Sequence, residues 1–174
     1  MATLYHLTSI PAAAAGAAAL ALAALMPVSA AADRAGVALD QNQKGVDAFN
    51  AHDAEGVAEI YAEDAVLHDP QLPEPIEGRE AIRETYAQML RTFPDARVTM
   101  RNVHAEGGLI MYEFEFSGTN HGPIATPEGD VPATGRRVEM PMAVFSDVDD
   151  DGRFRDTRRY YDTAEMMRQL GEDE

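Results

Sequence analysis

The chain has 174 residues, a length that suits one globular domain, and its 30 acidic against 14 basic side chains give a formal net charge of −16. Such a surplus of negative charge repels the phosphates of nucleic acids and of anionic membranes, so we expect neither as a partner. The sequence contains no cysteine, which excludes disulfides, thiolate nucleophiles and cysteine-ligated metals.

The first thirty residues differ from the rest of the chain in composition. From Ile10 to Ala32 the chain carries no charge and is mostly alanine, and Val28-Ser29-Ala30 has small residues at both critical positions of a signal-peptidase site. This pattern predicts a signal peptide over residues 1–30 and a single exported domain over residues 31–174, secreted or periplasmic and free of the membrane once processed. A retained membrane anchor and an untargeted, cytoplasmic protein stay open as alternatives, because no Lys or Arg precedes the apolar run.

Two helices are predicted at the start of the folded part. Apolar residues on one side favour a helix over Val37–Asn50, and Asp53 is a natural N-cap for a short second helix. We expect this second helix to turn inward the side chains of Val57, Ile60 and Tyr61. The run Ala65–Asp69 is typical of a short strand, and the proline-containing stretch Pro70–Gly78 is typical of a loop.

The clearest helical pattern follows that loop. A single apolar stripe ends before Pro94 and consists of Ile82, Tyr86, Met89, Leu90 and Phe93. These residues recur at helical spacing, and proline cannot continue a helix, so the sequence predicts a third helix that stops at this point.

After Pro94 the hydrophobic pattern alternates, as it does in strands. The expected strands and turns are, in chain order, Arg97–Val103, a hairpin turn at Gly107-Gly108, Leu109–Ser117, Arg137–Asp147, a turn at Asp149–Gly152 and Phe154–Tyr161. A closing helix is expected over Thr163–Leu170. Helices followed by hairpins predict an α+β fold, in which a curved antiparallel sheet packs on the N-terminal helices and encloses a pocket.

Several short segments, in this order and spacing, resemble one known family. They are Ala48–Asp53, Val66–Pro70, Gly78–Ile82, Phe116–Thr119, Pro132–Arg136, Tyr160–Asp162 and Gln169–Gly171. The family is that of the SnoaL-like polyketide (ester) cyclases, in the nuclear transport factor 2-like, steroid isomerase-like superfamily. The resemblance implies a cone of bent antiparallel sheet, a homodimer through the open sheet face, and cofactor-independent ring closure of the aldol type on a small apolar carbonyl substrate.

The resemblance also implies two catalytic residues. Asp162 matches the family's catalytic aspartate, a base that removes a proton from the carbon beside a carbonyl, and a carboxylate in an apolar pocket suits this task better than one at a surface. The alternative is that Asp162 caps the closing helix. His68 matches a family histidine that binds substrate oxygen, and a purely structural role is its alternative.

We expect a pocket lined by aromatic and methionine side chains together with one loop histidine. The expected ligand-binding residues are Phe49, Tyr61, Tyr86, Met89, His121, Met140, Met142 and Tyr160. The family's second histidine, in the penultimate strand, has no counterpart within Met140–Phe145. A non-catalytic module that binds a small molecule in the same cavity therefore stays open as a second function.

No metal and no cofactor are expected. Asp147–Gly152 fits the first half of a calcium-binding loop, but Arg158 stands at the twelfth position, where a bidentate acid is required. The spacing of His52, His68, His104 and His121 matches no metal-binding pattern, and the sequence has no nucleotide-binding glycine motif.

Overall fold

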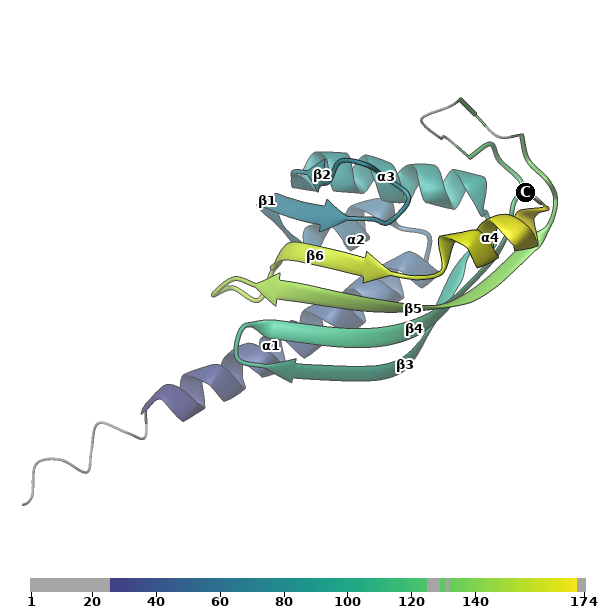
Figure 1. The fold of residues 1–174 in the computed structure, drawn as a ribbon. Helices are drawn as coiled ribbons and strands as arrows, with labels where there is room; N and C mark the ends of the chain where they lie inside the picture. Colours follow the sequence, from purple (N-terminus) through teal and green to yellow (C-terminus); the bar gives the residue numbers. More distant parts are fainter. Residues whose placement is uncertain (1–25, 125–128, 131, 172–174) are drawn as a thin grey trace, which may run out of the picture.

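Four helices and one curved sheet make up the computed structural model, which describes residues 26–124, 129–130 and 132–171 (Figure 1). The helices are α1 (Met26–Asn50), α2 (Ala54–Glu59), α3 (Arg79–Thr92) and α4 (Thr163–Leu170). The strands are β1 (Tyr61–His68), β2 (Ile76–Glu77), β3 (Arg97–Glu106), β4 (Leu109–Thr119), β5 (Arg137–Val148) and β6 (Phe154–Tyr160). The predicted α+β fold is confirmed.

The six strands form one open sheet in the order β2-β1-β6-β5-β4-β3. Both predicted hairpins, β3–β4 and β5–β6, are present as antiparallel pairs. One pair differs from the predicted antiparallel arrangement, since β1 pairs with β6 in parallel and the sheet is mixed. Hairpin signals are local, whereas β1 and β6 lie at opposite ends of the domain sequence and no local turn sets their relative direction.

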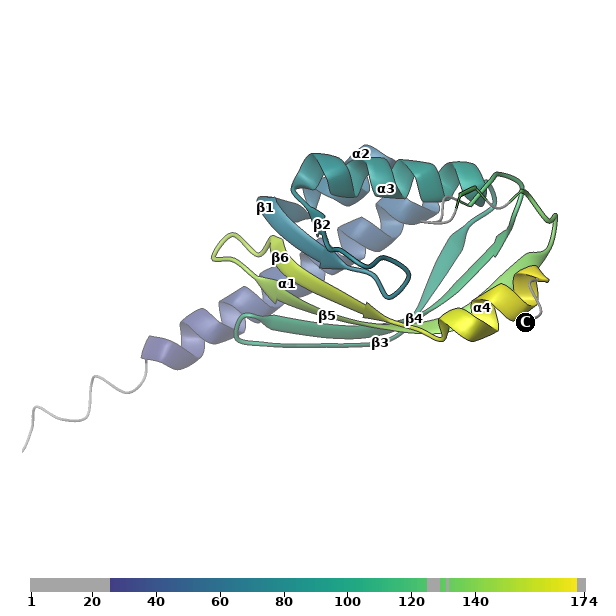
Figure 2. The same ribbon diagram turned by 45° about the horizontal axis from the view of Figure 1, so that its top comes forward.

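Irregular pairing bends the sheet around the helices. Register shifts interrupt the pairing of β3 with β4, of β5 with β6 and of β1 with β6, and such irregularities increase the twist and bend of a strand. Figure 2 shows the result: α1, α2 and α3 lie on the concave side of the sheet, and α4 follows the end of β6. The core lies between these helices and the concave face and includes fully buried Leu67, Ile82 and Phe154.

The N-terminal helix is longer than predicted, beginning at Met26 instead of Val37. The predicted cleavage position after Ala30 therefore lies within α1, while residues 1–25 of the predicted signal peptide lie outside the described residues. No helix in the described part of the chain is both long and apolar enough to cross a membrane. Export stays a prediction.

The segment around β1 differs from the prediction in its boundaries. Asp53 caps α2 as expected, accepting a hydrogen bond from the Gly56 amide at 3.0 Å. Tyr61 begins β1 and is not part of α2, and the predicted loop Pro70–Gly78 contains the two-residue strand β2. These short pieces pair across the sheet, so their limits depend on partners that local sequence does not specify.

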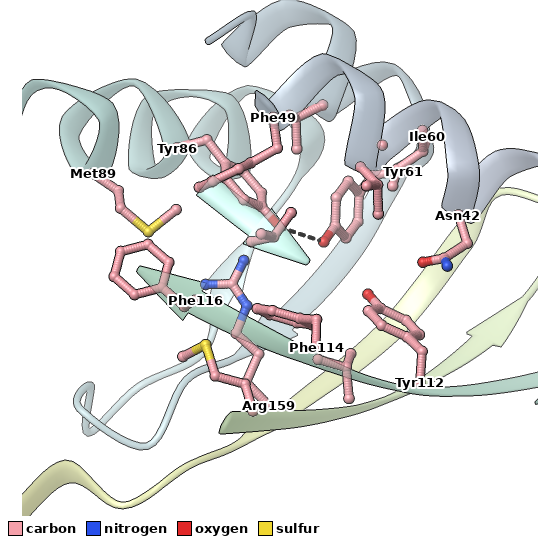
Figure 3. Close-up of a pocket in the computed structure, with 16 residues that line it drawn as sticks. Asn42, Phe49, Ile60, Tyr61, Tyr86, Met89, Tyr112, Phe114, Phe116 and Arg159 are labelled. Atoms are coloured by element: carbon pink, nitrogen blue, oxygen red, sulfur yellow. Dashed lines mark hydrogen bonds between the residues drawn. The ribbon is translucent and has the colours of Figure 1, made fainter. Parts of the chain in front are cut away.

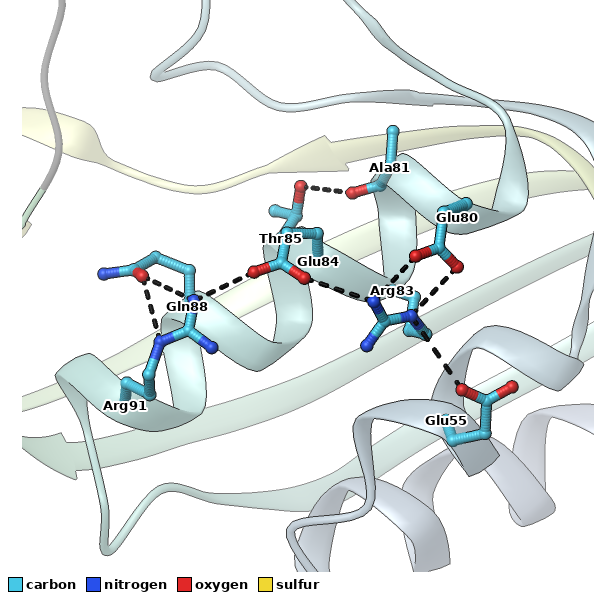
Figure 4. A network of polar contacts seen from close by, with 8 residues as sticks. All are labelled: Glu55, Glu80, Ala81, Arg83, Glu84, Thr85, Gln88 and Arg91. Atoms are coloured by element: carbon cyan, nitrogen blue, oxygen red, sulfur yellow. Dashed lines mark hydrogen bonds and ion pairs between the residues drawn. The ribbon is translucent and has the colours of Figure 1, made fainter.

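The outer surface of α3 carries a network of opposite charges (Figure 4). Arg83 donates to both carboxylate oxygens of Glu80, at 2.9 and 2.7 Å, and lies 3.9 Å from Glu55 of α2. Arg91 lies 3.1 Å from Glu84, about two helical turns away. Part of the large negative charge is thus balanced at the surface, away from the concave face.

A cavity between the helices and the sheet

The concave face of the sheet and the helices above it enclose a cavity, which we call the central cavity (Figure 3). The space between its atoms amounts to about 610 Å³, a volume that includes open solvent. Its wall is formed by Asn42, Gly45, Val46, Phe49, Val57, Ile60, Tyr61, Tyr86, Met89, Val98, Tyr112, Phe114, Phe116, Met142, Val144 and Arg159.

Strand alternation explains which side chains reach the cavity. Tyr112 on β4, Val144 on β5 and Arg159 on β6 are aligned in register across three neighbouring strands, so their side chains share the concave face. Phe49 of α1 packs edge-on against Phe116 of this face, with the ring centroids 6.5 Å apart, and edge-on against Tyr86 of α3, with the ring centroids 6.3 Å apart. The wall is therefore mostly apolar.

Two tyrosine hydroxyls supply polar groups inside this wall. The hydroxyl oxygens of Tyr61 and Tyr86 are 2.9 Å apart and hydrogen-bonded, and both residues are buried. Burial, together with the neighbouring Tyr86, raises the pKa of Tyr61 well above its ordinary value. Burial likewise raises the pKa of Tyr112. Tyr61 and Tyr112 therefore stay neutral at physiological pH and are available as hydrogen-bond donors.

A guanidinium group also faces the central cavity. The side chain of Arg159 is 10% exposed, its Nη1 lies 3.2 Å from Oδ2 of Asp69, and its Cζ lies 4.9 Å from the centroid of the Tyr86 ring. Burial acts to lower the pKa of Arg159, but Tyr86, Tyr61 and Asp69 outweigh it and the net pKa is raised. Arg159 is thus a permanent positive charge in an apolar wall.

The carboxylate that holds Arg159 has further donors of its own. Asp69 directly follows β1, its side chain is 11% exposed, and it accepts hydrogen bonds from the Tyr161 hydroxyl at 2.7 Å and from the Gln71 amide at 3.0 Å. Burial and the adjacent Asp69 raise the pKa of Tyr161, which stays protonated. These contacts fix the carboxylate and, through it, the position of the guanidinium.

The structure divides the predicted ligand-binding residues. Phe49, Tyr61, Tyr86, Met89 and Met142 lie on the wall of the central cavity. Met140 is buried but does not lie on this wall; it lies two residues closer to the start of β5 than Met142.

Tyr160 faces away from the central cavity. It is 53% exposed and packs edge-on against Phe145, itself 41% exposed, with the ring centroids 5.7 Å apart. It is directly adjacent to the inward-facing Arg159, and successive strand residues point to opposite faces. The outer face of the sheet thus carries exposed apolar side chains.

His121 lies in the segment after β4, where it is exposed and donates its backbone N–H to the Thr92 carbonyl at 2.9 Å. The neighbouring Asn120 is fully buried and secures this segment, accepting at its side-chain oxygen from the Thr134 amide at 2.6 Å. No residue of the described part of the Gly118–Gly135 stretch lies on the wall of the central cavity.

The two predicted catalytic residues lie off the cavity wall. Asp162 is exposed and is the N-cap of α4, accepting a hydrogen bond from the Glu165 amide at 2.9 Å, so the alternative interpretation as a cap is confirmed. His68 ends β1 with its side chain 40% exposed and its Nε2 3.6 Å from Oδ1 of Asp156. Their catalytic roles stay predictions from the resemblance.

Sequence reasoning missed Arg159 and Asp69. Arg158 and Arg159 are consecutive, and alternation alone does not tell which of the two faces inward. Pairing of Arg159 with the inward Val144 would have identified it. The described residues contain no group of three or more His, Asp or Glu side chains placed to bind a metal ion.

These features define the class of protein: an open curved sheet, helices on its concave face and a mostly apolar cavity between them, as in the steroid isomerase-like fold. The model of the SnoaL-like domain matches residues 43–157, and the chain belongs to this family. Among solved structures, IdmH of Streptomyces antibioticus, named as a polyketide cyclase, is 31% identical, with a TM-score of 0.61 over 77% of this chain and 98% of that one.

Two further solved structures have the same fold. TsrD from Streptomyces laurentii is 23% identical, with a TM-score of 0.67 over 78% of this chain and 96% of that one. A protein of Jannaschia sp. CCS1, named as a SnoaL-like polyketide cyclase, is 19% identical, with a TM-score of 0.68 over 80% of this chain and 94% of that one. The expected family is confirmed.

Proposed function

We propose that the central cavity binds a small, largely apolar compound that carries a carbonyl oxygen. The observation that carries this proposal is the distribution of polarity on the wall. Aromatic and aliphatic side chains cover most of it, and the hydroxyl pair of Tyr61 and Tyr86 and the guanidinium of Arg159 stand among them. Sites for small molecules are usually apolar with a few placed polar groups, which fix the orientation of the ligand.

The polarity of the wall favours a ligand that accepts hydrogen bonds. An isolated donor in an apolar cavity costs free energy unless an acceptor meets it. A carbonyl oxygen is such an acceptor, and the hydrocarbon remainder of the ligand suits the Phe114 and Phe116 side of the wall. A ligand of this kind also agrees with the relatives named as polyketide cyclases.

Cofactor-independent acid/base chemistry at the bound carbonyl, of the intramolecular aldol type, is the second candidate function. The observation that favours it is Asp69, a carboxylate nine-tenths buried and adjacent to Arg159 on the concave side. Against it, the wall residues of the described chain include no Asp, Glu or His. For Asp69 or Asp162 to accept a proton from the ligand, a local movement would have to bring its carboxylate into the cavity.

Methyl phenylacetate separates the two functions, because it carries a carbonyl, an apolar ring and exchangeable protons beside the carbonyl. We expect saturable binding in isothermal titration calorimetry, and no binding at any concentration would contradict the proposal. Incubation in D₂O, followed by NMR, then measures exchange at the α-carbon. Exchange that is faster than in buffer alone, and that Asp69→Asn abolishes, favours catalysis. Asp162→Asn is the matched variant, because Asp162 stands at the position of the family's catalytic aspartate. Binding without exchange favours the binding module.

A further inference from the structure

The bonding of Arg159 specifies more about the ligand than its size. One of its N–H groups donates to Asp69 at 3.2 Å, and this is its one hydrogen bond to the described residues. Its Cζ lies over the Tyr86 ring, 4.9 Å from the ring centroid. The rest of the guanidinium therefore has no acceptor from the described part of the protein, although nine-tenths of the side chain is removed from solvent. Figure 3 shows it projecting between Phe114 and Phe116 toward Tyr86.

The single carboxylate beside Arg159 neutralises it incompletely. The Asp69 carboxylate also accepts hydrogen bonds from the Tyr161 hydroxyl and from the backbone N–H of Gln71, so it does not interact with Arg159 alone. A buried cation is costly unless opposite charge and hydrogen bonds surround it. A second acceptor that brings negative charge would meet both needs at once.

We propose, building on the function proposed above, that the ligand of the central cavity carries a carboxylate group and that Arg159 binds it. A carboxylate presents two oxygens in the plane that the guanidinium fork prefers, and such charge-assisted pairs are stronger than a bond to a neutral carbonyl. The ligand is thus an apolar acid, whose hydrocarbon part contacts the aromatic wall.

Other anions fit this wall less well. Arg159 is the one charged side chain among the wall residues of the described chain. A phosphate would bring up to two negative charges and three acceptor oxygens with no second cation to meet them. A carboxylate brings one charge, which a single guanidinium can balance. The protein's own net charge of −16 opposes anion entry at long range, and salt at physiological concentration screens this repulsion.

Phenylacetate and methyl phenylacetate test the proposal, since they differ in little but the negative charge. Calorimetry on the full chain in 150 mM NaCl, with both probes at pH 7, should give at least about tenfold tighter binding of phenylacetate. Arg159→Gln should remove this preference, so that the two probes bind with affinities within about threefold of each other. Arg158→Gln, the adjacent arginine on the outer face, is the matched control and should change neither value.

Two further variants keep the test informative where Arg159→Gln unfolds. Arg159→Lys keeps the charge without the fork, and we expect it to retain part of the preference for phenylacetate. Asp69→Asn removes the competing carboxylate, and we expect phenylacetate to bind more tightly, by about tenfold. If the unaltered protein binds methyl phenylacetate as tightly as phenylacetate, or more tightly, the carboxylate proposal is overturned and the carbonyl-binding function still stands. Failure of both probes to bind would overturn both.

Discussion

The buried hydroxyl pair of Tyr61 and Tyr86 makes a quantitative prediction for two phenylalanine substitutions. The two oxygens are 2.9 Å apart, with the residues 1% and 9% exposed. A net hydrogen bond contributes about 1 kcal/mol, and a buried hydroxyl left without a partner costs about 1–3 kcal/mol. Tyr61→Phe and Tyr86→Phe each remove one hydroxyl and strand the other. Each should therefore lower the free energy of unfolding by about 1–2 kcal/mol.

The double variant gives the decisive comparison. Replacing both residues by phenylalanine removes both polar groups and keeps both rings, so no unpaired hydroxyl remains. We expect its loss of stability to be no larger than that of either single variant, which corresponds to a coupling free energy of about 1–2 kcal/mol. Urea unfolding followed by far-ultraviolet circular dichroism measures all four proteins. A loss in the double variant equal to the sum of the single losses would refute the reasoning.

Three further predictions concern the cap, the tyrosines and the outer face. Asp162→Ala should lower the free energy of unfolding by about 1 kcal/mol and Asp162→Asn by much less, because asparagine also caps helices; equal losses in urea unfolding would contradict the cap. Burial raises the pKa of Tyr61 and Tyr112 above the ordinary value near 10, so the native state retains protons that the unfolded chain releases. Stability should be complete below about pH 10 and fall above it by about 1.4 kcal/mol per pH unit for each tyrosine, a slope that Tyr61→Phe should reduce; an unchanged slope would be evidence against this. We also expect a homodimer through the outer sheet face, which Phe145→Glu should convert to monomer in sedimentation velocity; a monomeric parent would rule it out.

Patterns within one element predicted most of the fold. The apolar stripe of α3 and the two hairpin turns are local signals, and each element formed where its own residues indicate. The parallel pairing of β1 with β6 and the short strand β2 depend on contacts between distant segments. Helix α1 starts before the apolar stripe that predicts it, because alanine-rich sequence before Val37 supports a helix without such a stripe.

The candidate site was only partly predictable for the same reason. Phe49, Tyr86 and Met89 reach the cavity from helices whose buried side the hydrophobic spacing indicates. Arg159 reaches it from a strand of mixed charged and aromatic residues, where orientation depends on register with β5. Asp69 acts through its contact with Arg159, ninety residues away along the chain, and no sequence pattern links the two.

Methionine methyl groups offer the most direct test of the claim that the central cavity is the binding site. Met89 and Met142 lie on its wall, whereas Met111 lies on the outer face of the sheet. In ¹H–¹³C spectra of protein labelled at the methionine methyls, titration with methyl phenylacetate should shift the resonances of Met89 and Met142 and leave that of Met111 in place. Movement of Met111 alone, or saturable binding with Met89 and Met142 unmoved, would place the ligand elsewhere and contradict the account.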